Sequence, residues 1–441
     1  MDKITTRMAI GLVALCFLVL AIGCTGAEDT HVNDPIEDAG SDTDTDTDTD
    51  TDTGSDTDTG DDPTEGAVLN GTVMSPTGDI PISGALIYLT SEDVPVIPAE
   101  AYCYECDDMT GKDWTLSNAD GTWIIEDVPD GEWTIVTRKG FFQRQRTVTI
   151  TGEDELEIPE EYTTLPATNS GDGLDQIPRY AVILAVWDRT QDLLAKLGLG
   201  SVDVQGHLEY GTEVFDAYDD AETGGYPLSA TLFTTQDDLD AYHMLFMPCE
   251  SNANGVPFVL NQTEKVRTYV ENGGKMYNSC CASLWLESTF PVPIDFYGGM
   301  GTTDPTDVFD VGRIDTVAYT TTGNVQDTEM RDWLSGVTGL NVNSFPFTDG
   351  YVKIEETVDV DNGLGLEEDN LWVKPYTWVV DNMAYPGAPL MVTFNWGCGK
   401  VFYSVYETSQ AASATLTPQE LALLYVILEV GVCEGEYEPP E

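Results

Sequence analysis

Near its start the chain has an unbroken apolar run over residues 8–22, which is preceded by Lys3 and Arg7. At about 15 residues, this run is shorter than the ~20 residues that a helix needs to cross a bilayer. A short basic region followed by an apolar stretch and small residues is typical of a secretory signal peptide. We therefore expect residues 1–23 to be a signal peptide.

Residues 24–65 have the opposite character. Their centre, residues 41–60, alternates Asp with Thr and is broken only by Gly54 and Ser55. With no apolar side chain to bury and like charges at nearly every second position, such a segment cannot collapse and repels itself. Loose Ca²⁺ binding is the alternative, but the glycine turns and ligand spacing of a calcium loop are absent. We predict a disordered acidic tether.

From residue 66 the pattern becomes globular, with short alternating strands separated by turn residues up to residue 165. Asp120-Gly121 lies between two such strands and is a strong short-range hairpin signal. Short strands with turns every 8–12 residues indicate a small all-β sandwich. The expected strands cover residues 68–73, 85–89, 114–116, 122–125, 132–136 and 146–150.

After a linker over residues 166–178, the pattern changes to continuous apolar runs, which are typical of strands buried on both faces. These runs alternate with helical patterns, so residues 179–433 are predicted to form an α/β domain with a parallel sheet. An antiparallel pair and a closing helix complete it, and residues 434–441 form an acidic tail. The expected strands are 180–186, 242–248 and 275–279, the helices 191–199, 263–271, 280–287 and 417–429, and the antiparallel pair 390–394 with 400–405.

Charge narrows the classes of partner. The chain has 18 basic and 78 acidic residues and a formal charge of −60. Nucleic-acid binding depends on a basic surface, so no nucleic-acid partner is expected. Acidic lipid headgroups would also repel the folded part.

Cysteine usage points to an oxidising compartment. Nine cysteines less Cys16 and Cys24 leave seven, so at least one of them has no partner within the chain. Cys103 and Cys106 form a C-x-x-C motif, which could be half a zinc site or a redox motif. The chain has only three histidines and no second C-x-x-C pair, and the motif is not in a thioredoxin-like βαβ unit. We expect a local disulfide there, and no metal site or cofactor.

The segment Ala21-Ile22-Gly23-Cys24 resembles the bacterial lipobox, although Ala21 stands where Leu is usual. The resemblance implies that Cys24 is acylated and anchors the protein in a membrane, with the palmitate-type chains of a lipoprotein. Thr25, in place of Asp, implies sorting to the outer membrane by analogy. An ordinary secreted protein with a chance cysteine is the alternative.

The sandwich carries a second resemblance. The runs over residues 117–123 and 128–134, preceded by Gly71-Thr72-Val73 and by residues 84–87, are similar to the carboxypeptidase regulatory-like domain. Members of that superfamily serve as folding partners, adhesion spacers or sugar binders, so the resemblance implies a non-catalytic domain.

The α/β part resembles the class I glutamine amidotransferase-like fold, which has a flavodoxin-like sheet. The resemblance rests on residues 246–250, residues 270–277 and the final strand Gly399-x-Val401-x-Tyr403-Ser404. The two domains together, behind a lipobox, resemble myxobacterial-type lipoproteins.

In the amidotransferase family a cysteine on a sharp turn after a strand is the nucleophile, and this turn falls at Cys280 or Cys281. The family's histidine base follows the last strand, where Glu407 stands here, and no histidine follows His243. His207 lies in a loop, and a carboxylate is a poor base for a thiol with an ordinary pKa. We therefore expect no working triad.

Other candidate residues surround the same strands. Cys249 and Glu250 occupy the turn where the family supplies oxyanion-binding amides, and Cys249 is expected either to pair with Cys280 or Cys281 or to remain a buried thiol. Asp188 follows the first strand, where ligands bind in open α/β sheets, but helix capping is its expected role. Three aromatic residues either line a sugar site or pack in the core: Trp285, Trp378 and Trp396.

The sequence therefore predicts a non-catalytic binding or scaffold lipoprotein of the cell envelope, with a glycan or protein ligand. The alternative is a cell-envelope hydrolase that uses Cys280 or Cys281 with Glu250 or Glu407.

Overall fold

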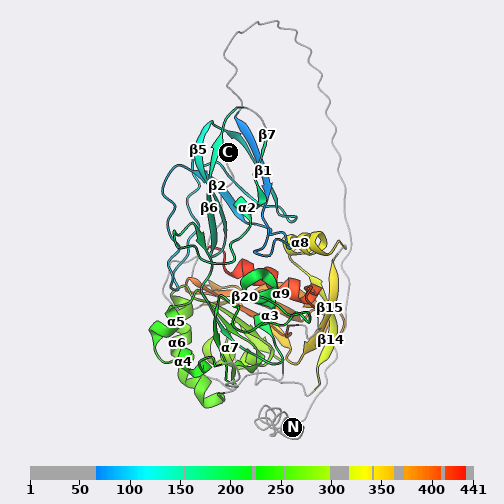
Figure 1. The fold of residues 1–441 in the computed structure, drawn as a ribbon. Helices are drawn as coiled ribbons and strands as arrows, with labels where there is room; N and C mark the ends of the chain where they lie inside the picture. The colour runs from blue at the N-terminus through cyan, green and yellow to red at the C-terminus, as the bar shows by residue number, and fades with distance from the viewer. Residues whose placement is uncertain are drawn as a thin grey trace, which may run out of the picture. The chain divides into compact units, whose positions relative to one another are not determined.

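Two β-sheet assemblies follow one another along the chain in the computed structural model (Figure 1). The structure describes residues 66–152, 155–220, 225–252, 254–297, 317–339, 342–361, 372–408 and 413–433. The predicted signal peptide, Cys24, the acidic tether and the acidic tail lie outside these residues. The described chain is mostly β-sheet with fewer helices, and none of its helices is long and apolar enough to cross a membrane.

The first assembly consists of a three-stranded sheet in the order β4-β1-β7 and a five-stranded sheet in the order β3-β2-β5-β6-β8. In β4, Trp123, Ile125 and Val128 are buried while most residues between them are exposed, as expected for a strand with one face against a core. Its strands are β1 Ala67–Thr72, β2 Leu86–Thr90, β3 Trp114–Leu116, β4 Thr122–Val128, β5 Gly131–Lys139, β6 Phe142–Ile150, β7 Glu155–Glu157 and β8 Asp175–Gln176, and α2 is Glu160–Thr163. β8 lies within the predicted linker and pairs with β6.

The predicted hairpin at Asp120-Gly121 is wrong. The turn exists, with Gly121 at φ 80° and its N–H bonded to the carbonyl of Asn118. However, β3 pairs with β2 and β4 pairs with β1, so the turn carries the chain from one sheet to the other. A side chain at position 121 would lie 2.6 Å from the carbonyl oxygen of Val73, so this crossing requires glycine.

The second assembly is a nine-stranded sheet in the order β10-β9-β11-β12-β21-β20-β19-β14-β15. The first five strands are parallel, and the remaining four continue the sheet in antiparallel fashion. Its strands are β9 Tyr180–Ile183, β10 Asp216–Tyr218, β11 Met244–Met247, β12 Lys275–Ser279, β14 Tyr319–Val325, β15 Ser344–Gly350, β19 Tyr376–Asp381, β20 Pro389–Trp396 and β21 Gly399–Ser404. Two small pairs, β13 Ile294–Phe296 with β16 Ile354–Thr357 and β17 Val360–Asp361 with β18 Trp372–Val373, lie beside it.

Helices connect parallel strands, as the alternation of strand and helix patterns in the sequence predicted. The π-helix η1 directly extends α3, and Gly198 at φ 114° ends the helical conformation there. The helical elements are α3 Thr190–Leu194, η1 Ala195–Leu199, α4 Ser229–Leu232, α5 Gln236–Asp240, η2 Cys249–Asn252, α6 Val256–Glu271, η3 Cys280–Ala282, α7 Ser283–Thr289, α8 Thr328–Thr338 and α9 Pro418–Val430.

Helix α9 begins with a capping box between Thr417 and Glu420 and has Pro418 in its first turn. All its residues are buried except Pro418 and Glu429. The sequence indicated an apolar stripe on one face, but the helix is covered on its other faces as well. Glu429 forms an ion pair with Lys139 of β5, which is itself in the first assembly.

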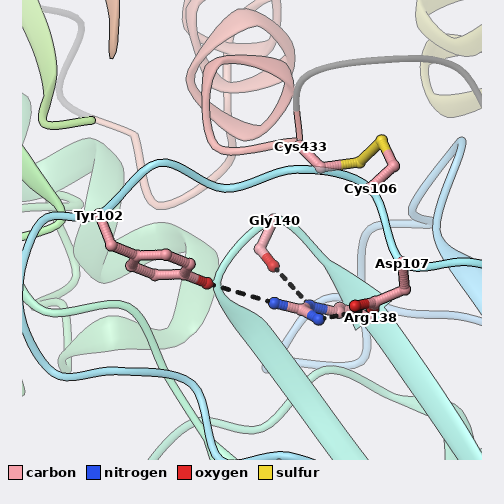
Figure 2. The surroundings of a disulfide bond; sticks show 6 residues. All are labelled: Tyr102, Cys106, Asp107, Arg138, Gly140 and Cys433. Atoms are coloured by element: carbon pink, nitrogen blue, oxygen red, sulfur yellow. Dashed lines mark hydrogen bonds and ion pairs between the residues drawn. A yellow bond between two sulfur atoms is a disulfide. The ribbon is translucent and has the colours of Figure 1, made fainter. Parts of the chain in front are cut away.

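Two disulfides join the segment between β2 and β3 to the second assembly. Cys103 is bonded to Cys398, in the turn between β20 and β21, and Cys106 is bonded to Cys433, just after α9 (Figure 2). The predicted local Cys103–Cys106 bond is therefore wrong. Spacing in the sequence identified two nearby cysteines, but each has a closer partner about 300 residues away, with separations of 295 and 327.

Side chains and backbone are closely packed around the two disulfides. Arg138 donates to Asp107 at 2.8 Å and to the hydroxyl of Tyr102 at 3.4 Å (Figure 2). A Cβ added to Gly140 would lie 2.7 Å from the carbonyl oxygen of Gly431, so the β5–β6 turn directly abuts the end of α9.

Candidate functional site

Four segments meet beyond the carboxyl ends of adjacent parallel strands. Asp188 follows β9, Cys249 follows β11, Cys280 follows β12 and Glu407 follows β21. The register pairs Met247 with Asn278, which places the residues two positions further along, Cys249 and Cys280, at the same level. In open parallel sheets ligands bind at this edge.

Cys280 forms a sharp turn between β12 and the helical segment η3. Its φ of 46° lies in the left-handed region, which costs a non-glycine residue about 1–3 kcal/mol. The hydroxyl of Tyr403, on the neighbouring strand β21, donates to the carbonyl of Cys280 at 2.7 Å and holds the turn. Of the two cysteines that the sequence offered for this turn, Cys280 therefore occupies it.

The thiols of Cys249, Cys280 and Cys281 form a cluster. All three Sγ atoms lie within 4.8 Å of one another, and those of Cys280 and Cys281 are 3.6 Å apart. None of the three forms a disulfide, so of the two alternatives expected for Cys249, a bond to a vicinal cysteine or a free thiol, the structure has the free thiol. Cys280 is fully buried and Cys281 is 8 % exposed.

The surroundings shift the pKa values of the three thiols in different directions. Hydrogen bonds from the other two thiols raise the pKa of Cys249, and burial raises the pKa of Cys280. Hydrogen bonds from Cys249 and then Cys280 lower the pKa of Cys281, so a thiolate in the cluster is best placed there. Burial, together with the charge of Asp188, raises the pKa of Glu407 to about 8, so its carboxyl group is mainly protonated at neutral pH.

Asp188 connects these segments and does not cap α3, the helix that follows it. Its Oδ1 accepts the N–H of Thr408 at 2.8 Å, and its Oδ2 accepts the N–H of Cys249 at 3.3 Å and the hydroxyl of Ser279. Helix α3 has no side-chain cap at its N-terminus, so the predicted capping role is wrong. Burial raises the pKa of Asp188.

Glu250 faces the chain after β9. Its Oε2 accepts the N–H groups of Val186 at 2.8 Å and Trp187 at 3.0 Å. These bonds hold a loop from which Trp187 projects with 51 % of its surface exposed. An exposed, supported tryptophan at the ligand-binding edge of a sheet is a candidate contact residue that the sequence analysis missed. The signal available was its position directly before Asp188.

Both described histidines lie apart from the thiols. His243 precedes β11, at the opposite end of that strand, and is stacked on Phe141 with centroids 4.3 Å apart. His207 bonds to Asp192 of α3 at 2.8 Å.

The three tryptophans considered for a sugar site pack in or against one hydrophobic core, each with different neighbours. Trp285 is fully buried and stacked on Phe233. Trp378 donates to Thr393 at 2.9 Å, and Trp396 donates to Glu271 at 3.2 Å. Their packing role is the one that the structure supports.

A hollow of about 500 Å³ lies at the other edge of the parallel strands. It is lined by residues 99–101, from the segment between β2 and β3, and by residues that precede the parallel strands, including Arg179, Asp240 and Asn272; none of its lining residues is aromatic. It offers charged groups but no ring on which a sugar could stack.

No family model and no curated protein matches the sequence. Among solved structures, the chain is similar to the cytoplasmic protein STM3548 from Salmonella typhimurium, with 12 % identity over 58 % of this chain and 99 % of that one and a TM-score of 0.33. It is also similar to cytoplasmic protein STM1381 from Salmonella typhimurium LT2, with 14 % identity over 57 % and 98 % of the chains and a TM-score of 0.32. A putative carbohydrate binding protein from Pseudomonas aeruginosa matches 24 % of this chain and 90 % of its own at 13 % identity, with a TM-score of 0.17. Similarities this low establish neither a shared fold nor a shared function.

Proposed function

We propose that this chain is a non-catalytic binding protein of the bacterial cell envelope, anchored at the outer membrane through acylated Cys24, with a glycan as its ligand. The anchor rests on the lipobox-like segment, and the two disulfides between distant parts of the chain fit an oxidising compartment. The acidic tether then holds the folded part away from the membrane.

The proposal includes the two domain families. The paired sheets β4-β1-β7 and β3-β2-β5-β6-β8 support a carboxypeptidase regulatory-like sandwich. The parallel order β10-β9-β11-β12-β21 corresponds to the 2-1-3-4-5 order of flavodoxin-like sheets, which supports an amidotransferase-like domain.

One observation supports a glycan ligand: Trp187 is exposed beyond the end of β9, on a loop held by Glu250. A large ring whose backbone is already fixed can stack on a sugar without a large loss of conformational entropy. Asp188 and Glu250 lie beside it but are committed to internal hydrogen bonds, so apolar stacking is the main contact offered there.

The test is glycan-array binding by the full chain. We expect binding to one class of glycan, and W187A should weaken it at least about tenfold, as removal of an aromatic anchor does. Y376A removes another exposed aromatic, on β19, and should bind as the wild type does. Absence of any glycan signal, or equal binding by W187A, would contradict the proposal.

A cysteine hydrolase is the second candidate, and the Cys280 turn favours it. Cys280 has the left-handed conformation typical of a nucleophile on a sharp turn, and the raised pKa of Glu407 brings this carboxyl group close to an ordinary thiol in basicity, although burial also raises the pKa of Cys280. The complete burial of Cys280 opposes it. Stoichiometric labelling of Cys280 by an electrophilic probe in the folded chain, slowed in E407Q, would support hydrolysis; labelling only after unfolding would exclude it.

A further inference from the structure

The thiol cluster has a feature that neither proposed function uses. Three cysteines from the ends of two neighbouring strands direct their sulfur atoms to one point, and a carboxyl group lies beside them. Glu407 acts electrostatically on Cys249 and Cys280 and is 4 % exposed, but its carboxylate oxygens lie outside the group of ligand atoms that are within 4.8 Å of one another, so its side chain must move towards the sulfur atoms to complete the site. We propose that Cys249, Cys280, Cys281 and Glu407 form a binding site for one Zn²⁺ ion.

The sulfur spacing fits a metal better than a disulfide. With Zn–S distances near 2.3 Å, tetrahedral ligands lie about 3.8 Å from one another. The Sγ atoms of Cys280 and Cys281 are 3.6 Å apart, and the third lies within 4.8 Å of both. Adjacent residues have Cα atoms about 3.8 Å apart, below the usual disulfide range, so Cys280 and Cys281 are poorly placed to bond with each other.

The backbone places consecutive cysteines on one side. In an extended strand, neighbouring side chains point to opposite faces. The left-handed conformation of Cys280 breaks this alternation and allows both vicinal thiols to face Cys249. Non-glycine residues in the left-handed region cluster at functional sites, and here such a residue brings three possible metal ligands together.

The surrounding shell is already organised. Asp188 bonds both the N–H of Cys249 and the hydroxyl of Ser279, so one buried side chain fixes the segments that carry all three thiols. Tyr403 holds the carbonyl of Cys280. Outer-shell bonds of this kind orient metal ligands and are important for affinity.

The ligand set selects the metal. Three thiolates favour a soft ion, while the carboxylate is a ligand that Zn²⁺ accepts and Cu⁺ disfavours. As each bond to zinc forms, the thiols and Glu407 release their protons to solvent, and no electron is transferred. The bound site carries a charge of −2, the same as a Cys₄ zinc site. The metal ion can enter from the side of Cys249, which is partly exposed, and Cys281, which is 8 % exposed.

The proposal departs from the sequence-based expectation of no metal site, which considered only the C-x-x-C pair. Cys249 is separated in sequence from the vicinal pair and has no spacing typical of a zinc motif. The site does not depend on glycan binding, so failure of one leaves the other standing.

The test uses the full chain, freed of metal by a chelator, with both disulfides verified by mass spectrometry. We expect one Zn²⁺ per chain, and Co²⁺ in its place should give thiolate-to-metal charge-transfer absorption. C249S and C281S should each bind Zn²⁺ at least tenfold more weakly. S251A is the matched control, because Ser251 is buried near Cys249 and its hydroxyl has no partner among the described residues; it should bind as the wild type does.

A second measurement needs no variant. Alkylation of Cys249, Cys280 and Cys281 is followed by mass spectrometry with and without Zn²⁺, and all three should be slowed together at least tenfold. Unchanged alkylation, absence of stoichiometric Zn²⁺ binding, or a disulfide involving Cys249 that forms in the presence of Zn²⁺ would overturn the proposal.

Discussion

His243 should make the stability of this protein depend on pH in a way that one substitution removes. Its Nδ1 accepts the N–H of Arg179 at 2.8 Å, and its Nε2 donates to the carbonyl of Pro98 at 2.6 Å. The ring is neutral in this arrangement, since a proton on Nδ1 would point at another N–H. Pro98 and Phe141 lie in the part of the chain before residue 166, so the ring also joins the two assemblies.

The magnitude follows from the pKa. Burial lowers the pKa of His243 from 6.5 to about 4, with Arg179 acting in the same direction and the bond to Pro98 opposing it. Because the folded pKa is depressed, the stabilisation is fully present above about pH 6.5 and is lost as the pH falls towards 4. Each pKa unit corresponds to about 1.36 kcal/mol, so lowering the pH to about 5 should cost roughly 2 kcal/mol of unfolding free energy from this group alone.

The assay compares wild type with H243Q by urea unfolding between about pH 7.5 and pH 5, which stays above the isoelectric point of about 4.1. Glutamine can keep both hydrogen bonds but does not titrate. The stability difference between the two proteins should therefore move in favour of H243Q by roughly 2 kcal/mol as the pH falls. A difference that stays constant with pH, or an NMR titration that places the pKa of His243 near 6.5, would refute the reasoning.

Three further substitutions test other parts of the structure. G140A should lower the free energy of unfolding by at least about 2 kcal/mol, because its Cβ would meet the backbone after α9. G111A, also at positive φ but with nothing within 4 Å of the added Cβ, should lower it by about 1 kcal/mol or less, and thermal denaturation compares the two variants. K196M should lower the free energy of unfolding by about 3–5 kcal/mol, because it leaves Glu420 buried without its 2.7 Å ion-pair partner. In urea unfolding, K196M/E420Q should recover part of this loss, and equal stability of the single and double variants would contradict the argument. C24S should abolish metabolic labelling with palmitate and release the protein from the membrane fraction, and continued labelling would disprove lipidation at Cys24.

The predicted elements show where local pattern was sufficient. The capping residues and apolar positions of the closing helix placed α9 within one residue at its ends, and the strand predicted over residues 275–279 coincides with β12. The turn around Cys398 was correctly read as joining an antiparallel pair, β20 and β21. In each case, side-chain periodicity and turn chemistry act within a few residues of one another.

The pattern was insufficient wherever the partner is distant. The extension of the sheet by β19, β14 and β15 was not predicted, and Asp120-Gly121 was misread because a tight turn does not specify which sheet the next strand joins. Asp188 was assigned to a local cap, whereas its actual donors, Ser279, Cys249 and Thr408, come from other strands.

The sequence by itself determined many of the strands and helices and the lack of a histidine after the last strand, since these depend on composition and local order, while the acidic tether and the oxidising compartment stay predictions. Only the tertiary structure decided which cysteines bond, which of Cys280 and Cys281 forms the turn, and that the thiols of Cys249, Cys280 and Cys281 meet. The reason is physical: side-chain pKa values, disulfides and ligand sites depend on distances between atoms, and chain segments hundreds of residues apart acquire those distances only when the sheets have formed and packed.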